Sequence, residues 1–194
     1  MATWVAVSVL ALAFAILAVS QLALYTHFAR MYVSSGQGLD SHGPKVGTIL
    51  APTVVARLDG ARRELPSPGQ PTVVLFGSTD CRVCRALQPS LISVALANPG
   101  VKLNIVYGGG PEAVRAALEG MPATVDRIAD PHLKLAASFG IGLSPMFVAT
   151  DASGRIVKKG IASDPTSIAQ LFDAASGRLA SWPSNWKTNE EVPA

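Results

Sequence analysis

The distribution of hydrophobic positions divides the chain into two unlike parts. Residues Ala2–Phe28 are almost continuously apolar, and the first charged side chain of the sequence is that of Arg30. An apolar run of more than about 20 residues is long enough for a helix to cross a bilayer. The pattern therefore predicts a transmembrane anchor over residues 1–29, followed by a linker over residues 30–46.

A cleaved signal peptide and a buried helix of a soluble protein are the two alternatives for this apolar segment. A signal peptide has a basic start, a shorter apolar stretch and a small-residue cleavage site, and none of the three is clear here. A buried helix of a globular protein is rarely this long without a polar face. Both alternatives therefore fit the segment less well than an anchor does.

Beyond the linker, short apolar stretches alternate with breaks rich in glycine and proline, which is typical of a folded domain. We expect one domain over residues 47–176 and a loosely ordered tail over residues 177–194. The run Thr72–Phe76 is short, apolar and rich in β-branched residues, as in a strand buried on both faces. The order of the expected elements predicts an α/β sandwich with a mixed sheet. These elements are a hairpin over 53–65, strands over 72–76 and 101–107, helices over 81–97, 111–118, 131–139 and 164–175, and a second hairpin over 146–159.

Composition narrows the possible functions of this domain. The 194 residues carry a net charge of +3 and only two cysteines. Two cysteines are too few to build a disulfide-rich scaffold. The basic residues form no cluster and do not interleave with aromatic residues, so the chain offers little to a phosphate backbone. Nucleic acid is therefore not an expected partner.

The strongest chemical signal is the pair Cys81 and Cys84, which lies directly after a predicted strand and at the start of a predicted helix. At a helix N-terminus, free backbone N–H groups and the helix dipole stabilise a thiolate. We therefore expect the pKa of Cys81 to be lowered, with Arg82 and Asp80 tuning it in opposite directions. Cys84 lies one turn further along the helix and should be more buried and protonated.

This asymmetry predicts thiol–disulfide exchange with a protein substrate. The Cys81 thiolate would attack a disulfide of the substrate, and Cys84 would then displace the substrate and close an intramolecular disulfide. In the reverse direction the same pair would oxidise a substrate. Neither direction requires a metal or an organic cofactor.

Three other uses of the two cysteines stay open at this point. A structural zinc site needs four ligands, and the candidates His27, His42 and His132 are not paired at ligand spacing. The two thiolates could instead hold Cu(I) in a metallochaperone, with Met146 or His132 as a further ligand. The cysteines could also be small buried apolar residues in a redox-inactive interaction module.

The dipeptide Ser144-Pro145 directly precedes the apolar run Met146–Thr150, which is expected to be a strand. A proline at the start of a strand inside a sheet is unusual, because it cannot donate a hydrogen bond to the neighbouring strand. A trans proline that merely ends a loop is the alternative. The trans proline is the more common case, so both interpretations of Pro145 stay open at this point.

Together these features resemble the thioredoxin superfamily. The matching features are the apolar strand, the Cys-x-x-Cys motif after it, Pro89 five residues beyond the second cysteine, Pro145, and a hairpin that ends in Gly160. The resemblance implies a three-layer thioredoxin-like sandwich with a mixed sheet. It also places Pro145 beside the cysteines, where a cis bond and Ser144 would shape a groove for the substrate chain.

Within the superfamily, the chain is similar to the membrane-tethered TlpA-like branch, and in particular to the methylamine-utilisation accessory proteins of the MauD type. This likeness depends on the uncharged anchor, an extra N-terminal β-hairpin, the Cys-x-Val-Cys motif, and the approach segment with Gly43-Pro44, Gly47 and Ala51-Pro52. It implies a protein substrate and, as a further partner, a membrane electron donor or acceptor. The expected process is maturation of a disulfide-containing enzyme such as methylamine dehydrogenase, or of cytochrome c.

The same likeness bears on the side of the membrane that the domain faces. Read literally, the positive-inside rule would place the domain in the cytoplasm, because Arg30 and Lys45 follow the anchor. Anchored members of the family work outside the cytoplasm, where disulfides persist. We therefore expect the domain to face the periplasm or the cell exterior.

The chain departs from the family pattern at three places near the motif. Asp80 stands where thioredoxins usually have tryptophan, and Leu75 stands where they have a buried aspartate on the strand. The segment Arg85–Pro89 lacks the glutamate that TlpA-like reductases often carry. An acidic group that would deprotonate Cys84 is therefore not expected in these three places.

Overall fold

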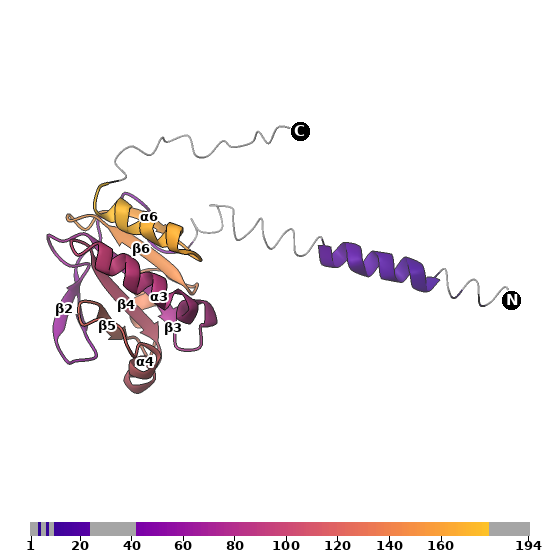
Figure 1. Ribbon diagram of the computed structural model, residues 1–194, viewed down its shortest axis with the longest axis horizontal. Helices are drawn as coiled ribbons and strands as arrows, with labels where there is room; N and C mark the ends of the chain where they lie inside the picture. The colour runs from indigo at the N-terminus through magenta and orange to yellow at the C-terminus, as the bar shows by residue number, and fades with distance from the viewer. Residues whose placement is uncertain (1–3, 5–6, 8–9, 24–41, 179–194) are drawn as a thin grey trace. The chain divides into compact units, whose positions relative to one another are not determined.

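The structure is a computed structural model that describes residue 4, residue 7, residues 10–23 and residues 42–178 (Figure 1). The chain divides into two compact units, Met1–Ser41 and His42–Ala194. Most of the predicted linker lies outside the described residues. The same holds for residues 24–29 of the predicted anchor and for residues 179–194 of the predicted tail.

The described part of the first unit is helical. Residues 10–23 form a helix, and its large apolar side chains are exposed, among them Leu10, Phe14 and Leu22. Over the residues that the structure describes, no helix is both long enough and apolar enough to span a membrane.

The second unit is built on a five-stranded mixed sheet. Its strand order is β5-β4-β3-β6-β7, with β3 at the centre. β3 and β4 are parallel, as are β4 and β5, whereas β6 runs antiparallel to both β3 and β7. The strands are β3 (Thr72–Ser78), β4 (Lys102–Gly108), β5 (Asp126–Ala129), β6 (Met146–Thr150) and β7 (Ile156–Gly160).

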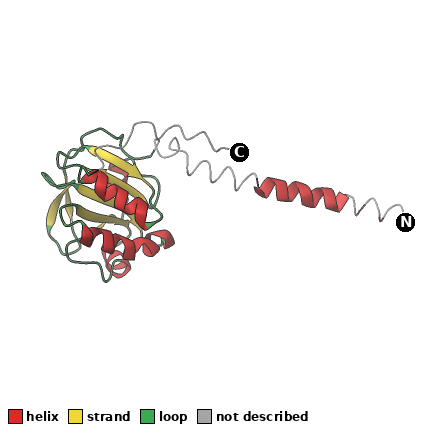
Figure 2. Ribbon diagram, turned by 45° about the horizontal axis from the view of Figure 1, so that its top comes forward, coloured by secondary structure: helices red, strands yellow, loops and turns green. Residues whose placement is uncertain are grey.

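One face of this sheet is covered by two long helices. Helices α3 (Arg82–Ala97) and α6 (Pro165–Ala175) pack side by side on one face (Figures 1 and 2). Because side chains alternate along a strand, Val73 and Leu75 of β3 enter the core under these helices. Phe76 points to the opposite face, where its ring lies 5.1 Å from the ring of Phe139.

Two short helices and a hairpin complete the unit. Helix α4 (Pro111–Ala117) packs against β5, and helix α5 (Lys134–Ser138) directly precedes Phe139. Strands β1 (Thr53–Ala56) and β2 (Arg62–Leu65) form a separate antiparallel pair. The hairpin is fixed to the sheet by an ion pair, because Arg57 Nε lies 3.1 Å from Oδ1 of the buried Asp126 on β5.

The predicted α/β sandwich with a mixed sheet is confirmed, and so is the extra hairpin. Strand β5 was not predicted, because Asp126 and Arg127 interrupt any hydrophobic pattern in this four-residue strand. The helix expected over 131–139 is shorter than predicted and begins at Lys134. The reason is that the preceding residue, Leu133, has a left-handed backbone conformation, which an α-helix cannot contain.

Candidate active site

The two cysteines lie where the central strand meets helix α3. The amide of Thr79 donates to the carbonyl of Gly108 on the neighbouring strand, and the amide of Cys81 donates to the carbonyl of Ser78. These bonds turn the chain from β3 into the helix. Cys81 is the N-cap residue of α3, and its Sγ accepts a hydrogen bond of 3.0 Å from the amide of Cys84.

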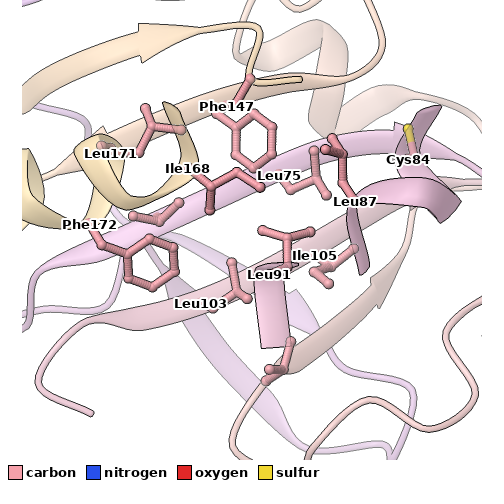
Figure 3. Close-up of a cluster of buried hydrophobic side chains, with 14 of the residues drawn as sticks. Leu75, Cys84, Leu87, Leu91, Leu103, Ile105, Phe147, Ile168, Leu171 and Phe172 are labelled. Carbon is pink, nitrogen blue, oxygen red and sulfur yellow. The ribbon is translucent and has the colours of Figure 1, made fainter. Parts of the chain in front are cut away.

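The two cysteines are joined by a disulfide and differ in exposure. Cys84 is fully buried, whereas Cys81 is half-buried. Figure 3 shows Cys84 at one end of the main hydrophobic core, next to Leu87. A sulfur atom of another protein can therefore reach Cys81 but not Cys84. At the helix N-terminus, the Cys84 amide is positioned to stabilise negative charge on the Cys81 sulfur once the disulfide is opened.

Gly77 and Tyr107 form the inner wall of the site beside Cys84. A Cβ atom on Gly77 would lie 2.6 Å from Tyr107 Cε1 and 3.1 Å from Cys84 Sγ, so the ring and the sulfur occupy the space that a side chain would need. Burial raises the pKa of Tyr107, against the opposing effects of the Gln88 side chain and the Arg85 charge. The phenol beside the disulfide is therefore neutral at physiological pH.

Ser144 and Pro145 border the disulfide from the other side. The Ser144–Pro145 peptide bond is cis. The Ser144 hydroxyl lies 3.7 Å from Cys84 Sγ and is exposed, whereas Pro145 is buried at the entrance to β6. The structure therefore brings Ser144 and Pro145 together with the cysteines.

The residues flanking the motif match the departures seen in the sequence. Leu75 is fully buried in the core under α3, so β3 carries an apolar side chain at this position. Asp80 and Arg82 are both exposed on either side of Cys81. The polar group that contacts Cys84 Sγ is a hydroxyl, that of Ser144.

The residues considered for metal binding are scattered. Met146 is fully buried at the start of β6, opposite Phe76, whereas His132 is exposed before α5. His27 lies outside the described residues. Within the described ranges, no group of three or more His, Cys, Asp or Glu side chains is placed to hold a metal ion.

A hollow of about 500 Å³ lies away from the cysteines. Among its lining residues are Arg62, Gln70, Lys102 and Asp126. Gln70 precedes β3, and Lys102 and Asp126 are the first residues of β4 and β5. The cysteines follow the opposite end of β3, so this hollow is separate from the disulfide site.

Two residues of the site were not predicted from the sequence, Gly77 and Tyr107. Gly77 continues the strand beyond the apolar run, and a glycine inside a strand can signal a close approach of another group. Tyr107 ends the predicted strand 101–107, and alternation along that strand would have placed it on the same face as Leu103 and Ile105. The pairing of Gly77 with Tyr107 needed the strand register.

The amino-acid sequence of this chain is similar to that of a known protein. No family model matches the chain. A protein of Methylobacillus flagellatus, methylamine utilization protein MauD, is 26% identical over 145 residues, which cover 71% of this chain and 68% of MauD.

Solved structures share the fold at lower identity. A secreted disulfide oxidoreductase of Mycobacterium tuberculosis, homologous to E. coli DsbE, has a TM-score of 0.57 and 23% identity over 63% of this chain and 95% of that one. The thioredoxin domain of a thiol-disulfide oxidoreductase from Bacteroides vulgatus has a TM-score of 0.59 and 20% identity over 67% and 96%. The thioredoxin-like fold, the likeness to MauD and the disulfide-linked Cys-x-x-Cys pair together indicate a thiol-disulfide oxidoreductase.

Proposed function

We propose that this oxidoreductase is a membrane-anchored enzyme that exchanges disulfides with protein substrates outside the cytoplasm. The observation that carries the proposal is the unequal burial of the linked cysteines. Cys81 is reachable from solvent at the start of α3, and Cys84 is enclosed by the core. One sulfur can therefore meet a substrate while the other is kept for the second step.

The reaction follows from this arrangement in two displacements. In the reduced enzyme, the Cys81 thiolate attacks a substrate disulfide, forms a mixed disulfide and releases one substrate thiolate. Cys84 then loses its proton and attacks Cys81 Sγ, which releases the second substrate thiolate. Two electrons pass from the enzyme to the substrate, and the Cys81–Cys84 disulfide seen in the structure is the product. The reverse sequence oxidises a substrate dithiol.

The Ser144 hydroxyl is positioned to assist the second displacement, in which Cys84 attacks Cys81. It is 3.7 Å from Cys84 Sγ, so it can donate a hydrogen bond to the sulfur as the proton leaves. A hydroxyl is a weaker aid than a carboxylate would be, since it stays neutral. We expect the displacement by Cys84 to be the slower of the two steps.

The membrane anchor is supported by the first part of the chain. Between Ala2 and Phe28 there is no Asp, Glu, Lys or Arg, and the helix over residues 10–23 exposes its apolar side chains. Such a surface is costly in water and favourable in a bilayer. A reporter that is active only outside the cytoplasm, fused after Ala194, tests the orientation, and activity is the expected result.

The substrate is proposed from the likeness to MauD, a protein whose name assigns it to methylamine utilization. A chain of this kind would act in the maturation of a disulfide-containing enzyme, such as methylamine dehydrogenase, or of cytochrome c. The two cysteines suffice for the exchange, so no resident cofactor is part of the proposal.

A trapping experiment tests the proposed reaction in cells. The Cys84→Ala variant cannot complete the second displacement. It should therefore accumulate mixed disulfides between Cys81 and substrate proteins, and dithiothreitol should reduce them. The Cys81→Ala variant is the matched control, because its remaining cysteine is buried and should capture almost nothing. Equal capture by the two variants, or none by either, would contradict the proposal.

A further inference from the structure

We propose that Lys159 is a positioning residue that keeps Ser144 against Cys84 by holding the loop over residues 140–145 in place. The inference rests on the proposed function and adds a residue that acts on the second displacement from outside the site. The contacts that support it are made by residues 42–50, which precede β1 and which we call the N-terminal strap. The strap runs along β7, the last strand of the sheet.

The second half of the N-terminal strap is hydrogen-bonded to the edge of β7. The Gly47 amide donates to Ile156 O at 2.8 Å, and the Ile156 amide donates to Thr48 O at 2.9 Å. Arg155 adds a side-chain bond of 2.7 Å from Nη1 to Gly47 O. The strap thus pairs with main-chain groups that an edge strand would otherwise leave open. It is a fixed part of the fold and can hold a neighbouring loop.

The first half of the strap packs against the loop over residues 140–145. The Gly43 amide donates to Gly140 O at 2.8 Å. A Cβ atom on Gly43 would lie 3.1 Å from Ile141 Cδ1 and 3.5 Å from Met146 Cε, so these side chains lie close to the Gly43 backbone. The strap therefore touches the loop at its start and the chain directly after its end.

Lys159 ties this half of the strap to β7. Its Nζ donates to His42 O at 2.8 Å and lies 3.5 Å from Gly43 O. The His42 side chain in turn lies beside the loop, since a Cβ atom on Gly142 would be 3.4 Å from its Nδ1. Hydrogen bonds from a charged donor are stronger than those between neutral groups. Lys159 thus fastens the strap at the point where the strap meets the loop.

Lys159 lies on the face of the sheet opposite to the buried cysteine. It is paired with Val148 on β6. Val148 points away from the helices α3 and α6, because its neighbours Phe147 and Ala149 enter the core beneath them. Lys159 can therefore act on the disulfide only through the loop, whose Ser144 hydroxyl lies 3.7 Å from the sulfur of the buried cysteine.

The preceding residue, Lys158, provides a natural comparison. It is paired with Ala149, so its side chain extends to the other face, where Nζ donates to Oε1 of Gln170 on α6 at 3.0 Å. Both lysines thus make a side-chain hydrogen bond from the same strand. The bond of Lys159 leads to the loop, and that of Lys158 leads to a helix.

The test separates the two displacements with the reduced full-length protein in detergent and an excess of dithiobis(nitrobenzoate), a symmetrical aromatic disulfide with a coloured thiolate. The chain has two cysteines. Attack by Cys81 releases one aromatic thiolate and leaves a mixed disulfide, and attack by Cys84 on Cys81 Sγ releases the second and closes the Cys81–Cys84 disulfide. In stopped-flow absorbance the rate of the first phase depends on reagent concentration, whereas that of the second does not.

The variants should affect the second phase alone. Ser144→Ala should slow it by about fivefold, the effect of one lost hydrogen bond, and Lys159→Met by about threefold, because the hydroxyl is shifted rather than removed. The double variant should be no slower than Ser144→Ala, since Lys159 acts through Ser144. Lys158→Met is the matched control and should leave both phases unchanged, and Lys159→Arg, which keeps a charged donor, should restore most of the rate.

Gly43→Ala disturbs the same contact from the side of the strap and serves if Lys159→Met folds poorly. Gly43 has φ 75°, and a Cβ atom there would press on Ile141. This variant should also slow the second phase selectively.

The inference would be overturned by equal slowing of both phases, by additive slowing in the double variant, or by an unchanged second phase in Lys159→Met or Ser144→Ala. A wild type that releases fewer than two thiolates and forms no Cys81–Cys84 disulfide would instead contradict the proposed function itself.

Discussion

Gly77 sets the distance between the central strand and the buried cysteine. Because glycine has no side chain, there is room beside it for the Tyr107 ring and for the Cys84 sulfur. A Cβ atom at this position would lie closer to both than van der Waals contact allows. The side chains of Tyr107 and Cys84 cannot easily shift away from such a Cβ atom, because both are fully buried. The glycine is therefore required by packing rather than by an unusual backbone conformation.

Gly77→Ala should destabilise the protein by roughly 1–3 kcal/mol, the usual cost of forcing extra atoms into a packed core. The measurement is the free energy of unfolding in urea. Gly100→Ala is the matched control, because a Cβ at Gly100 would meet no atom within 4 Å. Equal stability of the two variants would show that the space beside Cys84 is not filled.

At the scale of elements, the hairpin β1–β2 depends on one buried carboxylate. Asp126 Oδ1 lies 3.1 Å from both Arg57 Nε and Lys102 Nζ, and these groups meet as ion pairs rather than as aligned hydrogen bonds. Asp126 is 1% exposed. Arg57 belongs to the hairpin and Lys102 to β4, so the carboxylate joins three elements.

Asp126→Ala should lower the free energy of unfolding by about 3 kcal/mol, because it leaves the partly buried Lys102 without its counter-charge and leaves Arg57 with the more exposed Asp59 alone. Glu112→Ala breaks an exposed ion pair with Arg115 on α4 and serves as the control. It should cost less than about 0.5 kcal/mol. A cost for Asp126→Ala as small as that of the control would contradict a structural role for the ion pairs.

Helix α6 begins with a capping box that gives its stability a pH dependence. The hydrogen bonds from the Ser167 side chain and amide lower the pKa of Asp164. A carboxylate with a lowered folded-state pKa stabilises the fold above its unfolded pKa of about 4 and loses that effect as the pH falls further. The melting temperature of the wild type should therefore exceed that of Asp164→Ala at pH 7. The difference should shrink between pH 4 and pH 2, and a constant difference would contradict the assignment.

At the scale of the whole molecule, the hydrophobic pattern was sufficient to predict most of the fold. β3 is a short, continuous apolar run, α3 has helical periodicity, and the Cys-x-x-Cys motif marks their junction. The pattern could not predict β5, whose pairing with β4 depends on burial of Asp126 by residues distant in sequence. The contacts of Leu133 with Gly108 and of Tyr107 with Gly77 likewise arise only when strands pair.

The most direct test of the account is exchange between the reduced full-length protein and a disulfide-bonded protein, followed by counting thiols after acid quenching. The wild type should generate two substrate thiols for each Cys81–Cys84 disulfide that forms. Cys84→Ser should stop at a mixed disulfide on Cys81, and Cys81→Ser should not react. A wild type that exchanges no faster than Cys81→Ser would contradict the central claim that this pair is a working dithiol–disulfide centre.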